Sequence, residues 1–315
     1  MTQPSAQSYL FGPVPSRRLG RSLGVDVVPY KTCPFDCIYC QLGPTTRKTI
    51  VRREYVPTAE VCAQLRARLA GKPAWDYVTF SGSGEPTLHA HLGRMIATAK
   101  ELTSTPVAVL TNGALFSQPD LREEVAAADL IIPSLDAATP ATFARVNRPH
   151  PALRLETILG GLRRLREEFA GEVWLEIMLV RGLNDPPAEI EALVAAVSYL
   201  QPHKVQLNTV VRPPAENFAQ PLTRTELEQV AAAFTPPAEV IADLPLEVET
   251  LPAGTAVEEG ILSLLSRRPC TLEDVATSLH LHPAEALKYL NDLLKGGAIR
   301  EVRHGEKRFF VRGEG

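Results

Sequence analysis

The 315-residue chain has few cysteines, little net charge and no long apolar run. Five cysteines, an odd number in a chain of this length, argue against a disulfide framework. No stretch reaches the roughly 18 apolar residues that a membrane helix needs, and residues 1–10 lack the charged-then-apolar pattern of a signal peptide. Hydrophobic residues, at 45%, are enough for a full core. We therefore expect a soluble, cytoplasmic protein without a membrane partner.

The net charge of −3 hides an uneven distribution. Residues 1–53 contain eight basic and two acidic side chains, a net charge of +6, so the other 262 residues carry −9. The basic residues of this segment are Arg17, Arg18, Arg21, Lys31, Arg47, Lys48, Arg52 and Arg53. Either they lie on a solvated loop, or they offset something anionic that is held nearby.

Apolar runs alternate with amphipathic stretches from residue 54 to about residue 211. The expected strands cover 23–29, 77–81, 107–110, 130–134, 173–180 and 204–210, and the expected helices cover 58–70, 88–102, 118–128, 155–169 and 187–200. Continuous apolar runs are typical of parallel strands that are buried on both faces. Six units are fewer than the eight of a closed barrel. The pattern therefore predicts an α/β fold, a partial (β/α)6 TIM-like barrel with its chemistry at the carboxyl ends of the strands.

The pattern changes after prolines at 213–214, 236–237 and 252, between which one helix is expected near 223–234. Three short helices are then expected at 256–265, 271–279 and 283–294, followed by a hairpin of 298–302 and 307–311. Thr271 and Asp274 form a capping-box pattern at the second of these helices. The sequence thus predicts a partial barrel at 1–212, an extension at 213–254 and a winged helix-turn-helix domain at 255–315.

Three of the cysteines, Cys33, Cys37 and Cys40, lie within eight residues, directly after the first expected strand. Thiolates in a tight loop favour zinc or an iron–sulfur cluster. Structural zinc sites usually have four protein ligands, and no fourth Cys or His stands nearby. A [4Fe–4S] cluster held by three cysteines leaves one iron open to another ligand. Cys62 and Cys270 stand alone, and we expect them to be buried thiols.

The Cys-x3-Cys-x2-Cys loop, with Tyr39 before its last cysteine and a partial barrel behind it, resembles the radical S-adenosylmethionine (SAM) enzymes. The stretches that begin at Gly12-Pro-Val-Pro and at Ser81-Gly-Ser-Gly-Glu-Pro are similar to bacterial and archaeal iron–sulfur oxidoreductases related to the tRNA wyosine-base synthases. Those synthases carry further cysteines for a second cluster, which two isolated cysteines cannot supply. Their specific activity is therefore disfavoured here.

The resemblance implies that the three cysteines hold a [4Fe–4S] cluster and that SAM chelates its open iron. An electron from a flavodoxin- or ferredoxin-like donor of low potential would cleave SAM to methionine and a 5′-deoxyadenosyl radical, which would take a hydrogen atom from a substrate. The substrate is not readable from the motif. Modification of RNA, tRNA or protein is favoured, and radical activation of a partner protein is the alternative within the same class.

Several polar residues follow the expected strands at the same end of the sheet. The family places a Gly-Gly-Glu element near residue 83 to hold the amino group of SAM, and here Ser83 replaces its first glycine. Glycines permit close backbone approach to a ligand, and Glu85 can pair with an ammonium group, although the stretch is also consistent with an ordinary turn. The expected SAM-binding residues are Ser81, Gly82, Ser83, Gly84, Glu85, Thr111, Asn112, Ser134, Asp136 and Arg148.

Further polar residues, Glu176, Gln206 and Asn208, interrupt apolar strands, where they either line a pocket or satisfy neighbouring backbone groups. The basic N-terminal segment offsets the charge of a cluster and of SAM, and its surplus is available for an anionic substrate, either a phosphate-bearing molecule or RNA.

The expected C-terminal domain, taken from residue 256, has no net charge, but its wing is basic. Lys295, Arg300, Arg303, Lys307, Arg308 and Arg312 face only Glu301 and Glu306. RNA or another anion and a protein partner are equally consistent with this wing. From a different class, a zinc- or cluster-bearing regulator that binds DNA through the winged helix is the remaining alternative.

Overall fold

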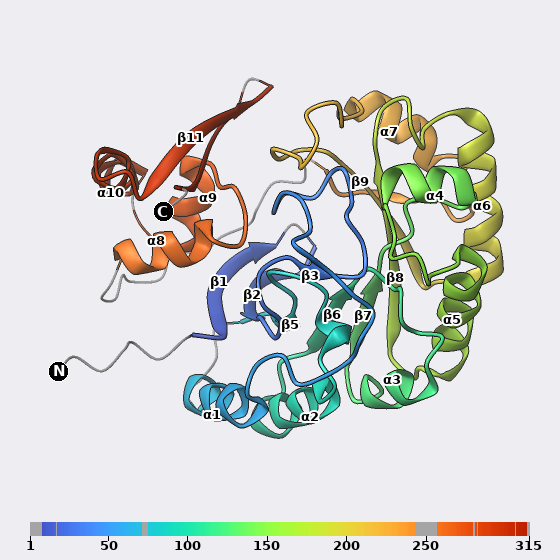
Figure 1. The fold of residues 1–315 in the computed structure, drawn as a ribbon, viewed down its shortest axis with the longest axis horizontal. Coiled ribbons are helices and arrows are strands. Elements are labelled where there is room, and N and C mark those ends of the chain that lie inside the picture. Colours follow the sequence, from blue (N-terminus) through green and yellow to red (C-terminus); the bar gives the residue numbers. More distant parts are fainter. Residues whose placement is uncertain are drawn as a thin grey trace.

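The computed structural model describes residues 8–16, 18–70, 75–242, 257–279, 281, 283–305 and 307–313. Arg17 and the expected domain boundary near residue 254 lie outside the described residues. One large α/β unit and a smaller C-terminal unit are visible in Figure 1.

An eight-stranded sheet in the order β1-β2-β5-β6-β7-β8-β9-β10 is the centre of the larger unit. The strands are β1 (Leu10–Ser16), β2 (Gly20–Val25), β5 (Tyr77–Phe80), β6 (Val107–Thr111), β7 (Leu130–Pro133), β8 (Glu172–Leu179), β9 (Lys204–Thr209) and β10 (Glu239–Val240). Strands β2 to β10 of this sheet pair in parallel, whereas β1 runs antiparallel to β2. The result is a mostly parallel α/β sheet, as the alternating pattern predicts.

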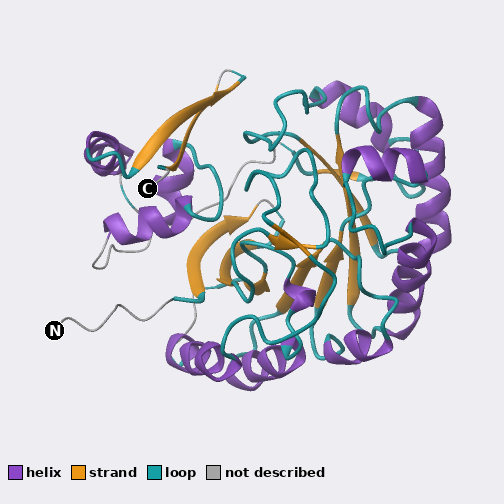
Figure 2. Ribbon diagram, in the orientation of Figure 1, coloured by secondary structure: helices purple, strands orange, loops and turns teal. Residues whose placement is uncertain are grey.

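Helices form the outer layer around this curved sheet (Figure 2). They are α1 (Thr58–Leu69), α2 (Leu92–Leu102), α3 (Pro119–Glu124), α4 (Pro140–Val146), α5 (Leu155–Glu168), α6 (Pro187–Leu200) and α7 (Arg224–Ala231). Each buries an apolar stripe against the strands, for example Leu65 of α1 and Met95 of α2, which are fully buried. None of the helices in the described part of the chain has the length and apolar character of a membrane span.

The sheet has two strands more than the six that the sequence predicts. Strand β1 contains Gly12 and two prolines, residues that are depleted in strands, and its pairing with β2 is interrupted between Phe11 and Val14. Such a strand is tolerated only at the edge of a sheet. Strand β10 is two residues long and follows Pro236 and Pro237. Because β10 pairs with β9 and α7 precedes it, part of the expected extension contributes to the larger unit.

The smaller unit has its own hydrophobic core. It consists of α8 (Val257–Leu265), α9 (Leu272–Ser278) and α10 (Pro283–Lys295), followed by the antiparallel hairpin of β11 (Ile299–His304) and β12 (Lys307–Arg312). The capping box expected at Thr271 and Asp274 is present at the start of α9. The order of three helices and a hairpin is the one expected from the sequence.

The two units contact each other along the edge of the barrel. The guanidinium group of Arg267 lies 4.3 Å from the centre of the Phe11 ring on β1 and 3.5 Å from the carboxylate of Asp26. Arg212, which follows β9, donates a hydrogen bond to the carbonyl of Pro269 at 2.8 Å. His304 of the hairpin hydrogen-bonds the carbonyl of Val210 at 2.9 Å. The C-terminal unit therefore packs against β1 and against the chain that follows β2 and β9.

Candidate active site

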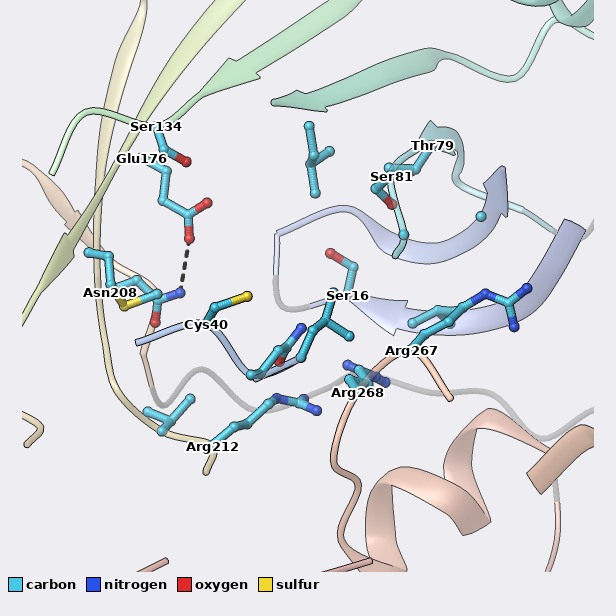
Figure 3. Close-up of a pocket in the computed structure, with 18 of the residues that line it drawn as sticks. Ser16, Cys40, Thr79, Ser81, Ser134, Glu176, Asn208, Arg212, Arg267 and Arg268 are labelled. Carbon is cyan, nitrogen blue, oxygen red and sulfur yellow. Dashed lines mark hydrogen bonds between the residues drawn. The ribbon is translucent and has the colours of Figure 1, made fainter. Parts of the chain in front are cut away.

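A cavity of about 630 Å³ lies at the carboxyl ends of the parallel strands. This volume is within the usual range for a small-molecule site. Its walls come from β1 and β2, from the loops that follow β5, β6, β7 and β9, and from the C-terminal unit. Figure 3 shows Cys40 in this pocket together with Ser81 and Ser134, which follow strands, and Glu176 and Asn208, which belong to β8 and β9.

The cysteine loop is fixed at both ends. Two short parallel strands, β3 (Thr32–Cys33) and β4 (Arg47–Lys48), pair across its base. The backbone N–H of Ile38 donates to the carbonyl of Val146, and that of Asp36 donates to the carbonyl of Asn147, each at 3.0 Å. These bonds attach the loop to the end of α4. Cys33, Cys37 and Cys40 are partly buried, and Cys33 and Cys40 line the cavity.

Each of the three sulfurs is met by a nitrogen donor from a different part of the chain. Asn112 Nδ2 lies 3.3 Å from the Sγ of Cys33, Asn147 Nδ2 lies 3.5 Å from that of Cys37, and Lys31 Nζ lies 3.1 Å from that of Cys40. Donors directed at sulfur stabilise thiolates and tune a cluster that the thiolates bind.

The glycine-rich stretch is shaped by internal packing. Gly82 has φ +147°, and a Cβ added there would lie 2.5 Å from the Cγ of Asp26, while a Cβ on Gly84 would lie 2.2 Å from the carbonyl oxygen of Thr32. Ser83 donates to Asp26 from its backbone N–H at 3.2 Å and from its hydroxyl at 2.5 Å. The glycines are therefore required for contact with β2 and the cysteine loop, and the whole stretch from Ser81 to Glu85 lines the cavity.

Glu85 holds this stretch to the next strand. Its carboxylate is buried and accepts hydrogen bonds from the Thr87 hydroxyl at 2.6 Å, the Thr111 hydroxyl at 2.7 Å and the Asn112 backbone at 2.7 Å. Burial raises the pKa of Glu85, and these donors oppose the rise. Thr111 and Asn112 thus meet Glu85 at the cavity wall, as their shared position in the sequence suggests.

Ser134 and Asp136 have different surroundings. Ser134 lines the cavity, whereas Asp136 is buried beside it. Asp136 accepts hydrogen bonds from the hydroxyl of Tyr39, from Asn147 Nδ2 at 2.7 Å and from the Met178 backbone at 2.9 Å. Burial raises its pKa to about 6 despite these donors. Since Tyr39 belongs to the cysteine loop, Asp136 anchors that loop to the sheet at β8.

Arg148 does not line the cavity in this structure. Its guanidinium group forms an ion pair with Glu216 at 2.5 Å, and its backbone has φ +45°. The sequence predicts that this side chain reaches the carboxylate of SAM. Glu216 lies 68 residues away in the chain, in the extension after β9, and no local pattern indicates that it captures the arginine.

The family model described as the radical SAM superfamily matches residues 27–195, more than half of the chain, including the whole cysteine loop. The chain belongs to the radical SAM superfamily. Enzymes of this superfamily use a [4Fe–4S] cluster and SAM, and these are the cofactors of the chain.

Several proteins are similar to this radical SAM chain. A UPF0026 protein of Methanocaldococcus jannaschii is 31% identical over 310 residues, which cover 96% of this chain and 95% of that protein. A protein of Brachyspira hyodysenteriae named GTPase Obg is 35% identical over 93% of this chain, but the chain spans only 43% of its length. The crystal structure of a radical SAM methyltransferase from Sphaerobacter thermophilus has a TM-score of 0.52 at 22% identity, covering 70% of this chain and 66% of that one, and shares the fold.

The residues of this radical SAM chain fit the cluster. In the described part of the chain, no three His, Cys, Asp or Glu side chains converge where one metal ion would bind. A [4Fe–4S] cluster does not require such a point, because each thiolate binds a different iron. Burial raises the pKa of Cys33 to about 12 and that of Cys37 well above its ordinary value, so thiolates here need positive charge to form. Iron supplies that charge.

Most of the basic N-terminal segment is used in internal contacts of the radical SAM chain. Arg18 pairs with Glu176 at 2.7 Å, and Arg52 pairs with Glu124 at 2.7 Å. The guanidinium group of Arg53 lies over the ring of Tyr55. Of the interrupting polar residues, Glu176 and Asn208 line the cavity and are 2.9 Å apart, whereas Gln206 bonds Glu239 of β10.

Sequence reasoning misses Asn147, Arg267 and Arg268 as site residues, and it finds Lys31 only as one of the basic residues of the N-terminal segment. Lys31 and Asn147 contact the cysteine sulfurs, and Lys31 is buried although it lies two residues before Cys33. Arg267 and Arg268 reach the cavity from the C-terminal unit. The only sequence signal at Arg267 and Arg268 is the Arg-Arg-Pro triplet that follows an expected helix.

Proposed function

We propose that Cys33, Cys37 and Cys40 hold the [4Fe–4S] cluster and that the protein uses it to cleave SAM reductively for hydrogen abstraction from a substrate in the cavity. The observation that carries the proposal is the set of three cysteine sulfurs in one anchored loop, each with its own nitrogen donor, two of them at the cavity wall. A cluster held by these cysteines would supply the one-electron chemistry that reductively cleaves SAM for hydrogen abstraction from the substrate.

The chain positions the reactants and excludes water. Ser81, Gly82 and Ser83 line the cavity, and Glu85 keeps this stretch against the end of β6. Arg18, Glu176 and Asn208 also line the cavity and contact one another, and this polar cluster suits a substrate rich in hydrogen-bonding atoms. The C-terminal unit forms one side of the cavity, which limits access of solvent to a reactive radical from that side.

We assign the C-terminal unit as a winged helix whose role is to close the cavity. Its order of helices and hairpin supports this reading, as do the contacts of Arg267 and His304 with the barrel. A DNA-binding regulator accounts less well for these contacts, because Lys307 at the start of the second hairpin strand also lines the cavity. The proposed partners are a low-potential, flavodoxin- or ferredoxin-like electron donor and an RNA or protein substrate that the winged helix contacts, and the proposed location is the cytoplasm.

We propose that the protein is related to the tRNA wyosine-base synthases but does not share their activity. Cys62 is buried in the core of the barrel, and Cys270 is buried in the core of the C-terminal unit. Two thiols in separate cores do not form a second cluster site with each other.

The test is anaerobic reconstitution of the full chain with iron and sulfide, followed by SAM and a strong reductant. We expect about four iron and four sulfide per chain and release of 5′-deoxyadenosine. C37A is expected to lose the cluster, whereas C62A, which removes a buried thiol outside the loop, is the matched control and is expected to keep it. Retention of a full cluster by C37A, or a complete absence of SAM cleavage by the loaded wild type, would contradict the proposal.

A further inference from the structure

The wall of the cavity that faces the strand ends is cationic. Arg212 follows β9, Arg267 and Arg268 follow α8, and Lys307 begins β12, and all four line the cavity. In Figure 3 the three arginines lie on one side of the pocket, and Thr79, Ser81 and Ser134 lie on the opposite side. Side chains from two units that are far apart in the sequence thus meet at one place.

Two of these four cations are paired with acidic groups. Arg267 pairs with Asp26 at 3.5 Å, and Arg212 lies 3.6 Å from Asp274. The other two are different. Nε and Nη2 of Arg268 are buried and have no hydrogen-bond partner within the described residues. Lys307 forms no ion pair with any residue that the structure describes.

Two arginines of this wall, Arg212 and Arg268, act on one carboxylate, that of Asp274. Burial raises the pKa of Asp274, but Arg212 and then Arg268 outweigh the burial and hold the pKa below its ordinary value. One carboxylate therefore faces two guanidinium groups and a lysine contributes to the same wall. Buried donors without partners are costly, and native proteins rarely keep them unless a ligand or water completes them. The wall consequently has more positive charge than its acidic partners neutralise.

We propose that this wall, formed by Arg212, Arg268 and Lys307, binds a phosphate group of the substrate. The inference rests on the proposed function, because it names the class of molecule on which that function acts. A guanidinium group presents two parallel N–H donors that match two oxygens of a phosphate, and a lysine adds a point charge. The rest of the substrate extends toward Glu176, Asn208 and Ser134, which line the same cavity.

The cationic N-terminal segment is not this site. Its Arg18, Arg21 and Arg52 are committed to Glu176, Asp76 and Glu124. The anion site is instead assembled by docking of the C-terminal unit, so a substrate phosphate would bridge that unit and the barrel. A phosphate of this kind belongs either to a small phosphorylated molecule or to a nucleotide within RNA.

The test is calorimetric titration of the reconstituted full chain, with SAM present, by pyrophosphate, uridine monophosphate and a ten-nucleotide single-stranded RNA. R268Q is expected to weaken binding by about tenfold or more, the usual effect of losing a charge-assisted hydrogen bond. R268K keeps the positive charge but loses the paired N–H donors of the guanidinium group, so its affinity is expected to lie between those of R268Q and the wild type. R300Q is the matched control, because Arg300 is exposed on the same unit and does not line the cavity.

The outcomes distinguish the two sources of the phosphate, and they separate failure of the anion site from failure of the proposed function. Tight binding of the mononucleotide alone identifies a small phosphorylated substrate, and tight binding of the RNA alone identifies an RNA phosphate; either supports the site if R268Q weakens it. The site is refuted if the wild type binds none of the three probes, if R300Q weakens binding as much as R268Q, or if R268Q weakens SAM as strongly as the phosphates. Release of 5′-deoxyadenosine by the wild type in any of these cases leaves the proposed function standing. Should R268Q fail to fold, K307M replaces it in the same comparison.

Discussion

Lys31 offers a direct way to test the donors around the cysteines. Its side chain is buried, and its ammonium group lies 3.1 Å from the Sγ of Cys40. Reduction of a bound cluster adds one negative charge beside that ammonium group. The lysine therefore favours the reduced state, and its replacement by methionine should lower the midpoint potential of the cluster.

The size of the shift follows from the charge and its distance. The added electron is spread over the cluster, so an effective separation of about 6 Å and a dielectric constant of about 20 give roughly 3 kcal/mol. For one electron, about 1.4 kcal/mol corresponds to about 59 mV, so K31M should lower the potential on the order of 100 mV. Because Lys31 is buried, screening by salt should reduce this value only slightly.

The assay is a potentiometric titration of the reconstituted protein followed by electron paramagnetic resonance. K31R keeps the positive charge and should remain close to the wild type. K48M is the matched control, because Lys48 is exposed on β4 and donates to the carbonyl of Arg148 rather than to sulfur. If K31M binds a complete cluster at the wild-type potential, or if K48M shifts the potential equally, the reasoning about Lys31 is wrong.

Two further predictions concern packing and charge. G84A should destabilise the protein by about 2 kcal/mol or more in urea unfolding, because the new Cβ would meet the Thr32 carbonyl at 2.2 Å. G160A is the control: Gly160 lies in a helix, and a Cβ added there would meet no atom within 4 Å, so this variant should stabilise the protein by about 0.5–1 kcal/mol. Equal effects of the two substitutions would refute the reasoning. D274N should tighten pyrophosphate binding several-fold in calorimetry while costing up to about 1 kcal/mol of stability at the α9 cap. The pKa of Asp274 is lower in the folded protein than in the unfolded chain, so ionised Asp274 stabilises the fold at pH values above its unfolded pKa. This stabilisation is lost as the pH falls through the folded pKa. D274N should therefore lack this part of the acid dependence of stability.

The predictable parts of the fold are those written in local patterns. The alternation of strands and helices, the cysteine spacing and the capping box of Thr271 and Asp274 each depend on residues close together in the chain. Strand β1 lacks such a pattern, because its prolines and glycine are tolerated only by its edge position. Arg148 forms an ion pair with Glu216, which lies 68 residues away in the chain, and no local pattern predicts such a pair.

The candidate site divides in the same way. Residues that follow strand ends, such as Thr111 and Ser134, reach the cavity because the parallel topology brings all strand ends together. Lys31 and Arg268 act through tertiary contacts, since the first turns back onto Cys40 and the second enters only when the C-terminal unit docks. Composition gives the number of cations but not the carboxylates that neutralise them.

Asp26 has a position that links the two units thermodynamically. It accepts two hydrogen bonds from Ser83 in the glycine-rich stretch and pairs with Arg267 of the C-terminal unit. Undocking would leave the carboxylate without its cation beside the stretch proposed to hold SAM. Any ligand that prefers the ordered form of that stretch must therefore strengthen docking, and docking must strengthen the ligand by the same factor. Ser83 strengthens this link, because its hydroxyl gives Asp26 a second hydrogen bond beside that of its backbone N–H.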